Sequence, residues 1–93
     1  AYDYTAALGI SAADQDMLHP ACDLARGRMQ VALVPLGIRV SDGATNVLPA
    51  GTDAEAVHAA WRIHMRHIRH SLRNGFYQSW DLHPAQLVSR YAA

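Results

Sequence analysis

The sequence has 93 residues, and its eight arginines are balanced by seven aspartates and one glutamate, which leaves a formal net charge of zero. A chain of this length has room for one domain, near the size at which core burial only just offsets chain entropy. The zero net charge excludes an overall basic field, so we expect neither nucleic acid nor an anionic membrane as a partner, and the single cysteine, Cys22, excludes an internal disulfide.

The first third of the chain is predicted to contain the end of a strand and one helix. The start at Ala1-Tyr2-Asp3 has no initiator methionine and no signal-like segment, which predicts a fragment or a processed chain located in the cytoplasm. No apolar run approaches the ~20 residues of a membrane span. We expect residues 1–4 to end a strand, and apolar spacings of three and four predict a helix from Pro20 to about Val34.

The middle of the chain is predicted to contain a short strand, a long loop and the strongest helix. Residues 38–41 predict a strand that closes on Asp42, and turn residues dominate the loop at 43–53. Thr52 or Asp53 caps a helix over residues 54–74, which Gly75 should end. The inner face of this helix is predicted to consist of Val57, Ala60, Trp61, His64, Ile68 and Leu72.

The last stretch is predicted to be a strand that runs into a helix. Residues 76–82 are aromatic-rich and short enough for a buried strand, and Pro84 suits the first turn of a helix. His83 lies where this strand ends, which in parallel αβ folds is where ligands bind. Strands alternating with helices predict a parallel sheet. Three such units leave both sheet edges open, so we expect a homo-oligomer or the remainder of a longer chain to cover them.

Two groups of residues resemble a known family. They are Tyr2-Asp3-Tyr4-Thr5-Ala6-Ala7-Leu8-Gly9 followed by Ser41-Asp42-Gly43, and the stretch from Gly75-Phe76 through Trp80-Asp81-Leu82-His83-Pro84-Ala85-Gln86. On these residues the whole chain resembles the last part of the HpcH/HpaI aldolase and citrate lyase β-subunit superfamily, in an uncharacterised aldolase-like branch. The resemblance implies an α/β fold, namely the last three βα units of a TIM (β/α)8 barrel.

The resemblance also implies divalent-metal chemistry. Members of the superfamily cleave or form carbon–carbon bonds in oxo acids or CoA thioesters, with Mg²⁺ or Mn²⁺ held by one Glu and one Asp. A hard cation prefers oxygen ligands and polarises a carbonyl as negative charge develops on it. Asp3 matches the position of the metal-binding Asp, whereas the partner Glu, the substrate-binding Arg and the base would lie in earlier units. We therefore expect the isolated chain to be inactive.

Each candidate site residue has an alternative interpretation from its local sequence. Asp3 is either the metal ligand or a carboxylate that caps a turn or helix. Asp42 precedes Gly43, so it is either a residue of the substrate rim or a turn residue. His83 is either a rim residue with a catalytic role or a corner residue whose ring hydrogen-bonds the backbone. The final strand of the family often carries Gly-Lys, a pair that this chain lacks.

Three histidines on the long predicted helix, His64, His67 and His70, suggest a metal site because they are spaced by three. Each step of three turns ~60° backwards around a helix, however, so the outer two side chains diverge. A zinc-protease helix would also need Glu next to the first histidine, where this chain has Met65. We therefore do not predict zinc binding here.

An arginine stripe follows the same helix and consists of Arg62, Arg66, Arg69 and Arg73. Such a stripe could follow phosphate groups. The alternative is a solvated helix face or an ion-paired contact in an oligomer, which the zero net charge and the absence of base-stacking aromatics favour.

Two functional hypotheses follow from the sequence. In the first, the chain is a fragment of a divalent-metal-dependent aldolase or lyase, with Asp3 as its one identifiable ligand. In the second, it is a non-catalytic βα module that uses its open edges and its arginine stripe to associate with itself or with a partner.

Overall fold

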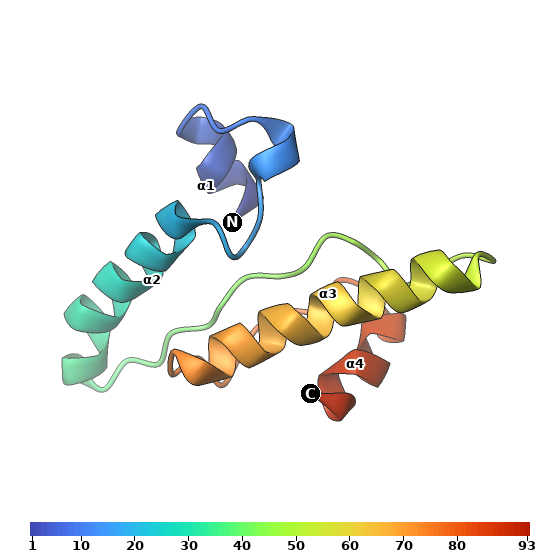
Figure 1. Ribbon diagram of the computed structural model, residues 1–93. Helices are drawn as coiled ribbons and strands as arrows, with labels where there is room; N and C mark the ends of the chain where they lie inside the picture. Colours follow the sequence, from blue (N-terminus) through green and yellow to red (C-terminus); the bar gives the residue numbers. More distant parts are fainter.

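The structure, a computed structural model, describes all of residues 1–93 and contains helices but no strands (Figure 1). The four α-helices are α1 (Tyr2–Ala7), α2 (Pro20–Leu33), α3 (Ala54–Arg73) and α4 (Leu87–Ala92), with 3₁₀ turns at Ala12–Asp14, Val34–Leu36 and Pro84–Gln86. α1 contacts α2, and α4 packs against the long central α3. The molecule is flat, with extents of 45 × 31 × 17 Å.

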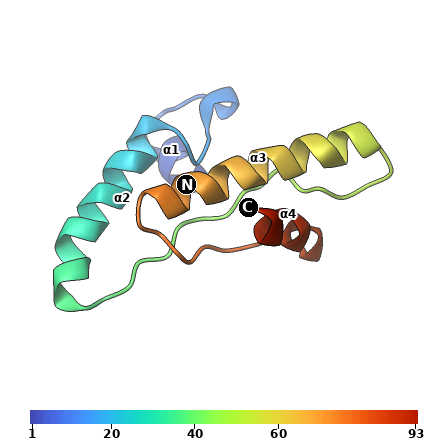
Figure 2. The same cartoon turned by 60° about the horizontal axis from the view of Figure 1, so that its bottom comes forward.

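The predicted α/β fold, three βα units of a TIM barrel, is therefore wrong. Residues 1–4, expected to end a strand, begin α1 instead. The predicted strands at 38–41 and 76–82 lie within two extended segments that run side by side beneath α3 (Figure 2). These segments are joined where Asp42 N–H donates to the Gln78 carbonyl at 2.8 Å and by one isolated parallel bridge between Ala44 and Trp80.

The extended segments meet at one backbone hydrogen bond and one bridge, and side chains take two of the backbone donors nearby. Gly43 N–H donates to the Asp42 carboxylate at 2.8 Å, and Leu82 N–H donates to the Gln86 side chain at 2.8 Å. A parallel ladder needs evenly spaced backbone bonds along both strands. The contact between these segments is too short to provide such a ladder.

The predictions for the two longer helices are confirmed. α2 begins at Pro20, where the His19 ring caps the helix by accepting from Ala21 N–H at 3.0 Å. α3 begins after Asp53, whose carboxylate accepts from Glu55 N–H at 3.0 Å. Gly75, at φ 86°, takes the left-handed conformation just after the end of α3, as a helix-stopping glycine does.

The interior of the molecule is small and mostly polar. Its apolar part consists of Met17, Cys22, Ala60, Ile68 and Phe76. Nine further buried residues carry polar or charged side chains: Thr5, Arg26, Asp42, Thr45, His64, His67, Ser71, Gln86 and Ser89. Burial of such groups is costly unless every donor and acceptor is paired. No buried side-chain nitrogen or oxygen lacks a partner here, so hydrogen bonds organise this core as much as apolar packing does.

Candidate functional site

The inner face of α3 carries a buried polar network, the structure's densest group of titratable residues. Three histidines each place Nε2 against an aspartate from a different part of the chain. The pairs are His64–Asp81 at 3.0 Å, His67–Asp16 at 2.9 Å and His70–Asp23 at 2.9 Å. α3 therefore holds the C-terminal segment, the N-terminal segment and α2 through one histidine each.

His64 lies between a hydroxyl and a carboxylate. Its Nδ1 contacts the Ser89 hydroxyl, and its Nε2 contacts Asp81, which also accepts two bonds from Arg90. Hydrogen bonding and the charge of Arg90 lower the pKa of Asp81, so this carboxylate is ionised and can only accept. Burial lowers the pKa of His64 despite that carboxylate, so the neutral ring donates from Nε2 and accepts from Ser89 at Nδ1.

The hydroxyl, imidazole and carboxylate of this group are the same residue types that form a hydrolytic triad. A nucleophilic serine must reach the substrate carbon that it attacks. Ser89 is only 1 % exposed, and its hydroxyl also lies within hydrogen-bonding distance of the Gln86 carbonyl. The group consequently fixes α4 against α3 and does not form an accessible catalytic centre.

His67, about one turn further along α3, also lies between a hydroxyl and a carboxylate. The Thr45 hydroxyl lies 2.7 Å from Nδ1, and Asp16 lies 2.9 Å from Nε2. Burial lowers the pKa of His67, which keeps the ring neutral near pH 7. Thr45 in turn presents its backbone carbonyl to the side chain of Gln86 at 3.0 Å. His67 thus joins the loop before α3 to Asp16 in the N-terminal segment, and Thr45 of that loop contacts Gln86 near the C-terminus.

Asp42 and Arg26 form the buried ion pair of the network. Arg26 Nε donates to Asp42 Oδ1 at 2.8 Å, and Ser71 donates to the other carboxylate oxygen. Burial alone would raise the pKa of Asp42, but the hydrogen bonds from Ser71, Arg26 and Gly43 outweigh it and lower the pKa. Because both oxygens are occupied by protein donors, Asp42 acts as a structural anion between α2 and α3.

The structure places the three residues predicted for the site in unrelated surroundings. Asp3 is exposed in the first turn of α1. Asp42 is buried against Arg26 and does not lie at an open surface. His83 is half-buried and caps the Pro84–Gln86 turn, where its Nδ1 accepts from Ala85 N–H at 3.0 Å. The alternative interpretation of His83, as a corner residue bonded to the backbone, describes what is seen.

The residues present do not fit the implied Mg²⁺ or Mn²⁺. Such a cation takes several oxygen ligands, of which a protein site supplies at least one or two carboxylates in a fixed geometry. No group of three or more His, Cys, Asp or Glu side chains gathers as a ligand set, at Asp3 or elsewhere in the chain. No metal-dependent step can be derived from this fold.

Sequence reasoning found part of the network. His64 was predicted to face inward, whereas His67 and Ser71 were not. Ala60, His64, His67 and Ser71 follow one another at spacings of four, three and four, and Ile68 lies beside His67 on the same helix face. Counting polar residues in that pattern, together with the apolar ones, would have identified the whole inner face of α3.

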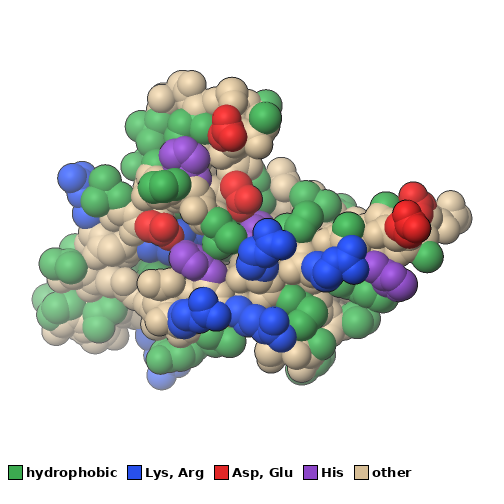
Figure 3. Space-filling model, viewed as in Figure 1, with side chains coloured by type: hydrophobic (Ala, Val, Ile, Leu, Met, Phe, Trp, Pro, Cys, Tyr) green, Lys and Arg blue, Asp and Glu red, His purple; other side chains and the backbone are tan.

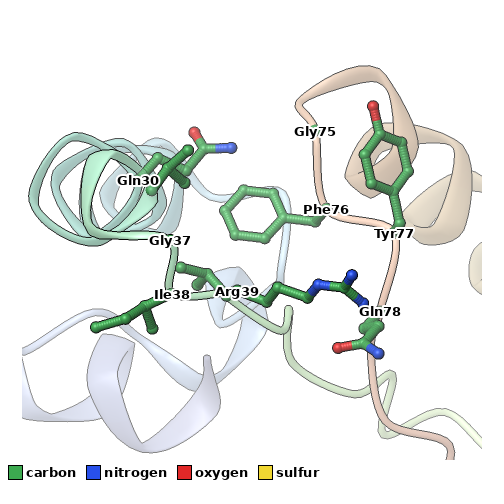
Figure 4. A pocket seen from close by; sticks show the side chains of 10 residues that line it. Gln30, Gly37, Ile38, Arg39, Gly75, Phe76, Tyr77 and Gln78 are labelled. Carbon is green, nitrogen blue, oxygen red and sulfur yellow. The ribbon is translucent and has the colours of Figure 1, made fainter.

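A cleft of about 630 Å³ opens between the two extended segments, next to the end of α2 (Figure 4). Its walls are formed by residues 37–40 and 75–78, with Gln30 and Val34 from the end of the first long helix and its 3₁₀ turn. Phe76 projects into the cleft from one segment, and the Arg39 side chain extends across it toward Gln78. Apolar and polar side chains both line this hollow.

The chain belongs to a family described as a domain of unknown function, DUF6986, which matches residues 1–93. No curated protein and no solved structure matches the chain. None of its helices combines the length and the apolar character that spanning a membrane would require. The family assignment therefore gives no activity, and the function has to be argued from the surface and the network.

Proposed function

We propose that this chain is a non-catalytic assembly unit that pairs with a second copy of itself through its two extended segments. A monomeric protein of 10.2 kDa exposes about 5,300 Å², whereas this chain exposes 6142 Å². The excess, about 800 Å², is the area that one partner buries in a standard protein interface. The amount of uncovered surface is the observation that carries the proposal.

The uncovered surface includes the cleft and the exposed aromatic residues beside it. Tyr77 is 80 % exposed and Trp80 is 69 % exposed, although aromatic side chains gain most from burial. Ile38 is also exposed in the facing segment. Tyrosine and tryptophan are enriched in the centres of protein interfaces, where they supply most of the binding energy.

The backbone of the same segments offers unpaired hydrogen-bonding groups. The N–H groups of Arg39, Val40 and Tyr77 donate no hydrogen bond within the chain. An open edge of this kind binds a further extended segment by β-augmentation. Antiparallel pairing of residues 38–41 with the same residues of another copy is self-complementary, as a two-fold interface requires. A second copy therefore supplies partners for the backbone groups on the edge of residues 38–41, together with apolar cover.

Charge also favours this face over the outer face of α3. The chain has no net charge, so two copies do not repel each other as whole molecules. A two-fold contact through the arginine stripe would place like charges opposite one another, which costs energy. The cleft presents one arginine, Arg39, and no acidic side chain. Pairing through the extended segments avoids the repulsion.

A charged substitution in the cleft tests this proposal. Tyr77→Glu would place a carboxylate in the dimer contact, and we expect the dimer dissociation constant to rise at least about tenfold, which corresponds to ~1.4 kcal/mol. The matched control is Val31→Glu, at a residue of α2 that is 79 % exposed and does not line the cleft. Light scattering after size-exclusion chromatography measures both variants. Equal effects of the two substitutions would contradict the proposed contact.

The carbon–carbon lyase activity implied by the resemblance to the HpcH/HpaI superfamily stays a prediction from the residues. Its proposed ligand, Asp3, is exposed on α1 and has no neighbouring ligand set in this fold. The oxo-acid or CoA thioester substrate likewise has no site to which it can be assigned. The uncovered surface favours the assembly unit instead.

A further inference from the structure

The outer face of α3 carries four arginines that no acidic residue neutralises. Arg62, Arg66, Arg69 and Arg73 are all exposed, and every ion pair of the structure uses other residues. At 100° per residue the four positions fall within about 60° of the helix circumference, and they extend over about 16 Å of helix. Figure 3 shows the arginine side chains gathered over α3.

The zero net charge of the chain conceals this local excess, because the acidic residues are used elsewhere. Asp16, Asp23, Asp42 and Asp81 are all engaged by histidine or by the arginines Arg26 and Arg90. Asp53 caps the start of α3. Asp42 and Asp81 thus pair with Arg26 and Arg90 inside the molecule, and no ion pair reaches the arginine stripe. This removes the main reason for interpreting the stripe as a merely solvated face.

The stripe also costs helix stability. Like charges three or four residues apart on a helix destabilise it. Arg62 with Arg66, Arg66 with Arg69, and Arg69 with Arg73 have this spacing along α3. A helix face that only needed to be soluble would alternate arginine with glutamate, and these opposite charges would stabilise the helix. The arrangement therefore indicates a ligand that supplies the missing negative charge.

The stripe borders a hollow of about 500 Å³, which falls within the size range of small-molecule sites. Leu18 closes it from the N-terminal segment, and Met65 and His70 complete the lining. Guanidinium groups bind phosphate oxygens with two parallel hydrogen bonds each. No Phe, Tyr or Trp side chain lines the hollow, so it lacks the large aromatic platform on which nucleic acid bases usually stack.

We infer that this hollow binds a small ligand carrying two or more linked phosphate groups, held by Arg62, Arg66, Arg69 and Arg73. A single phosphate can contact only adjacent arginines, whereas linked phosphates reach several of them along the helix. The site does not depend on dimer formation, because the hollow and the cleft share no lining residue.

Inorganic tripolyphosphate is the probe that tests this inference, measured by isothermal titration calorimetry on the full chain. We expect it to bind at least tenfold more tightly than orthophosphate. Arg66→Gln should weaken tripolyphosphate binding at least tenfold, whereas Arg28→Gln, which removes the same charge from an exposed position on α2, should change it less than twofold. Without ligand, Arg66→Gln should leave the melting temperature unchanged or raise it, since it removes like-charge repulsion.

Three results would overturn the inference. Equal weakening by Arg66→Gln and Arg28→Gln would show that only the total charge matters. Equal affinity for orthophosphate and tripolyphosphate would show that the stripe does not act as one site. Tighter binding of single-stranded DNA or of anionic phospholipid vesicles, at equal phosphate concentration, would assign the stripe to a macromolecule instead.

Discussion

At the scale of the single residue, the histidines of α3 connect proton binding to folding. His64 and His67 are buried beside aspartates, and burial lowers the pKa of both rings. The folded state therefore holds them neutral, while the unfolded chain protonates them near their ordinary value of about 6.5. Their contribution to stability is complete above that pH. As the pH falls below it, the unfolded state binds more protons and the contribution is lost.

We expect the free energy of unfolding to fall as the pH is lowered from 7 toward 5, and His67→Gln to reduce the size of that fall. Asp42 and Asp81 do not cause this loss, because a carboxylate with a lowered pKa keeps its full contribution above its ordinary pKa of about 3.8 and loses it only as the pH falls through that value. Urea unfolding at several pH values measures the effect. His58→Gln, on the exposed side of α3, is the control and should retain the wild-type pH dependence. A wild-type stability that is flat between pH 7 and 5 would contradict the buried, neutral histidines.

At the scale of the element, the two longer helices could be predicted from sequence, whereas the start of α1 and the segments between the helices could not. Asp53, the threes and fours of the long helix, and Gly75 are local signals, and α3 begins and ends where they indicate. Residues 76–82 have strand composition, yet composition cannot supply the neighbouring strand that a ladder needs. The aspartate–histidine pairs join residues far apart in the chain, and no local pattern specifies which aspartate meets which histidine.

Two glycines with opposite roles test the helix boundaries. Gly75→Ala should destabilise the chain by about 1 kcal/mol or more, because alanine is strained at φ 86° and its Cβ would lie 3.3 Å from Gln30 Nε2. Gly27→Ala should stabilise it by about 0.5–1 kcal/mol, since Gly27 lies inside α2 and a Cβ there meets nothing within 4 Å. Thermal unfolding by circular dichroism measures both. Shifts of the same sign would contradict the assigned end of α3.

At the scale of the whole molecule, the chain is too open for its size. Its radius of gyration is 13.9 Å, whereas about 12 Å is expected for a compact domain of this length. Few apolar residues are buried, and the polar network supplies specific connections without much hydrophobic burial. The same flat shape leaves the cleft on the extended segments and the arginine stripe on α3 open to different ligands. A partner bound at the cleft would bury apolar surface that the isolated chain leaves exposed.

Hydrogen exchange of the extended segments, followed as a function of protein concentration, tests the assembly unit most directly. The amides of Arg39, Val40 and Tyr77 have no hydrogen-bond partner within the chain, and pairing of residues 38–41 with a second copy protects whichever of Arg39 and Val40 faces the shared edge. We predict that all three amides exchange freely in dilute solution and that one of the Arg39 and Val40 amides becomes protected as the concentration rises, while the amides of α3 stay unchanged. Free exchange of all three at every concentration would contradict pairing of the chain with itself.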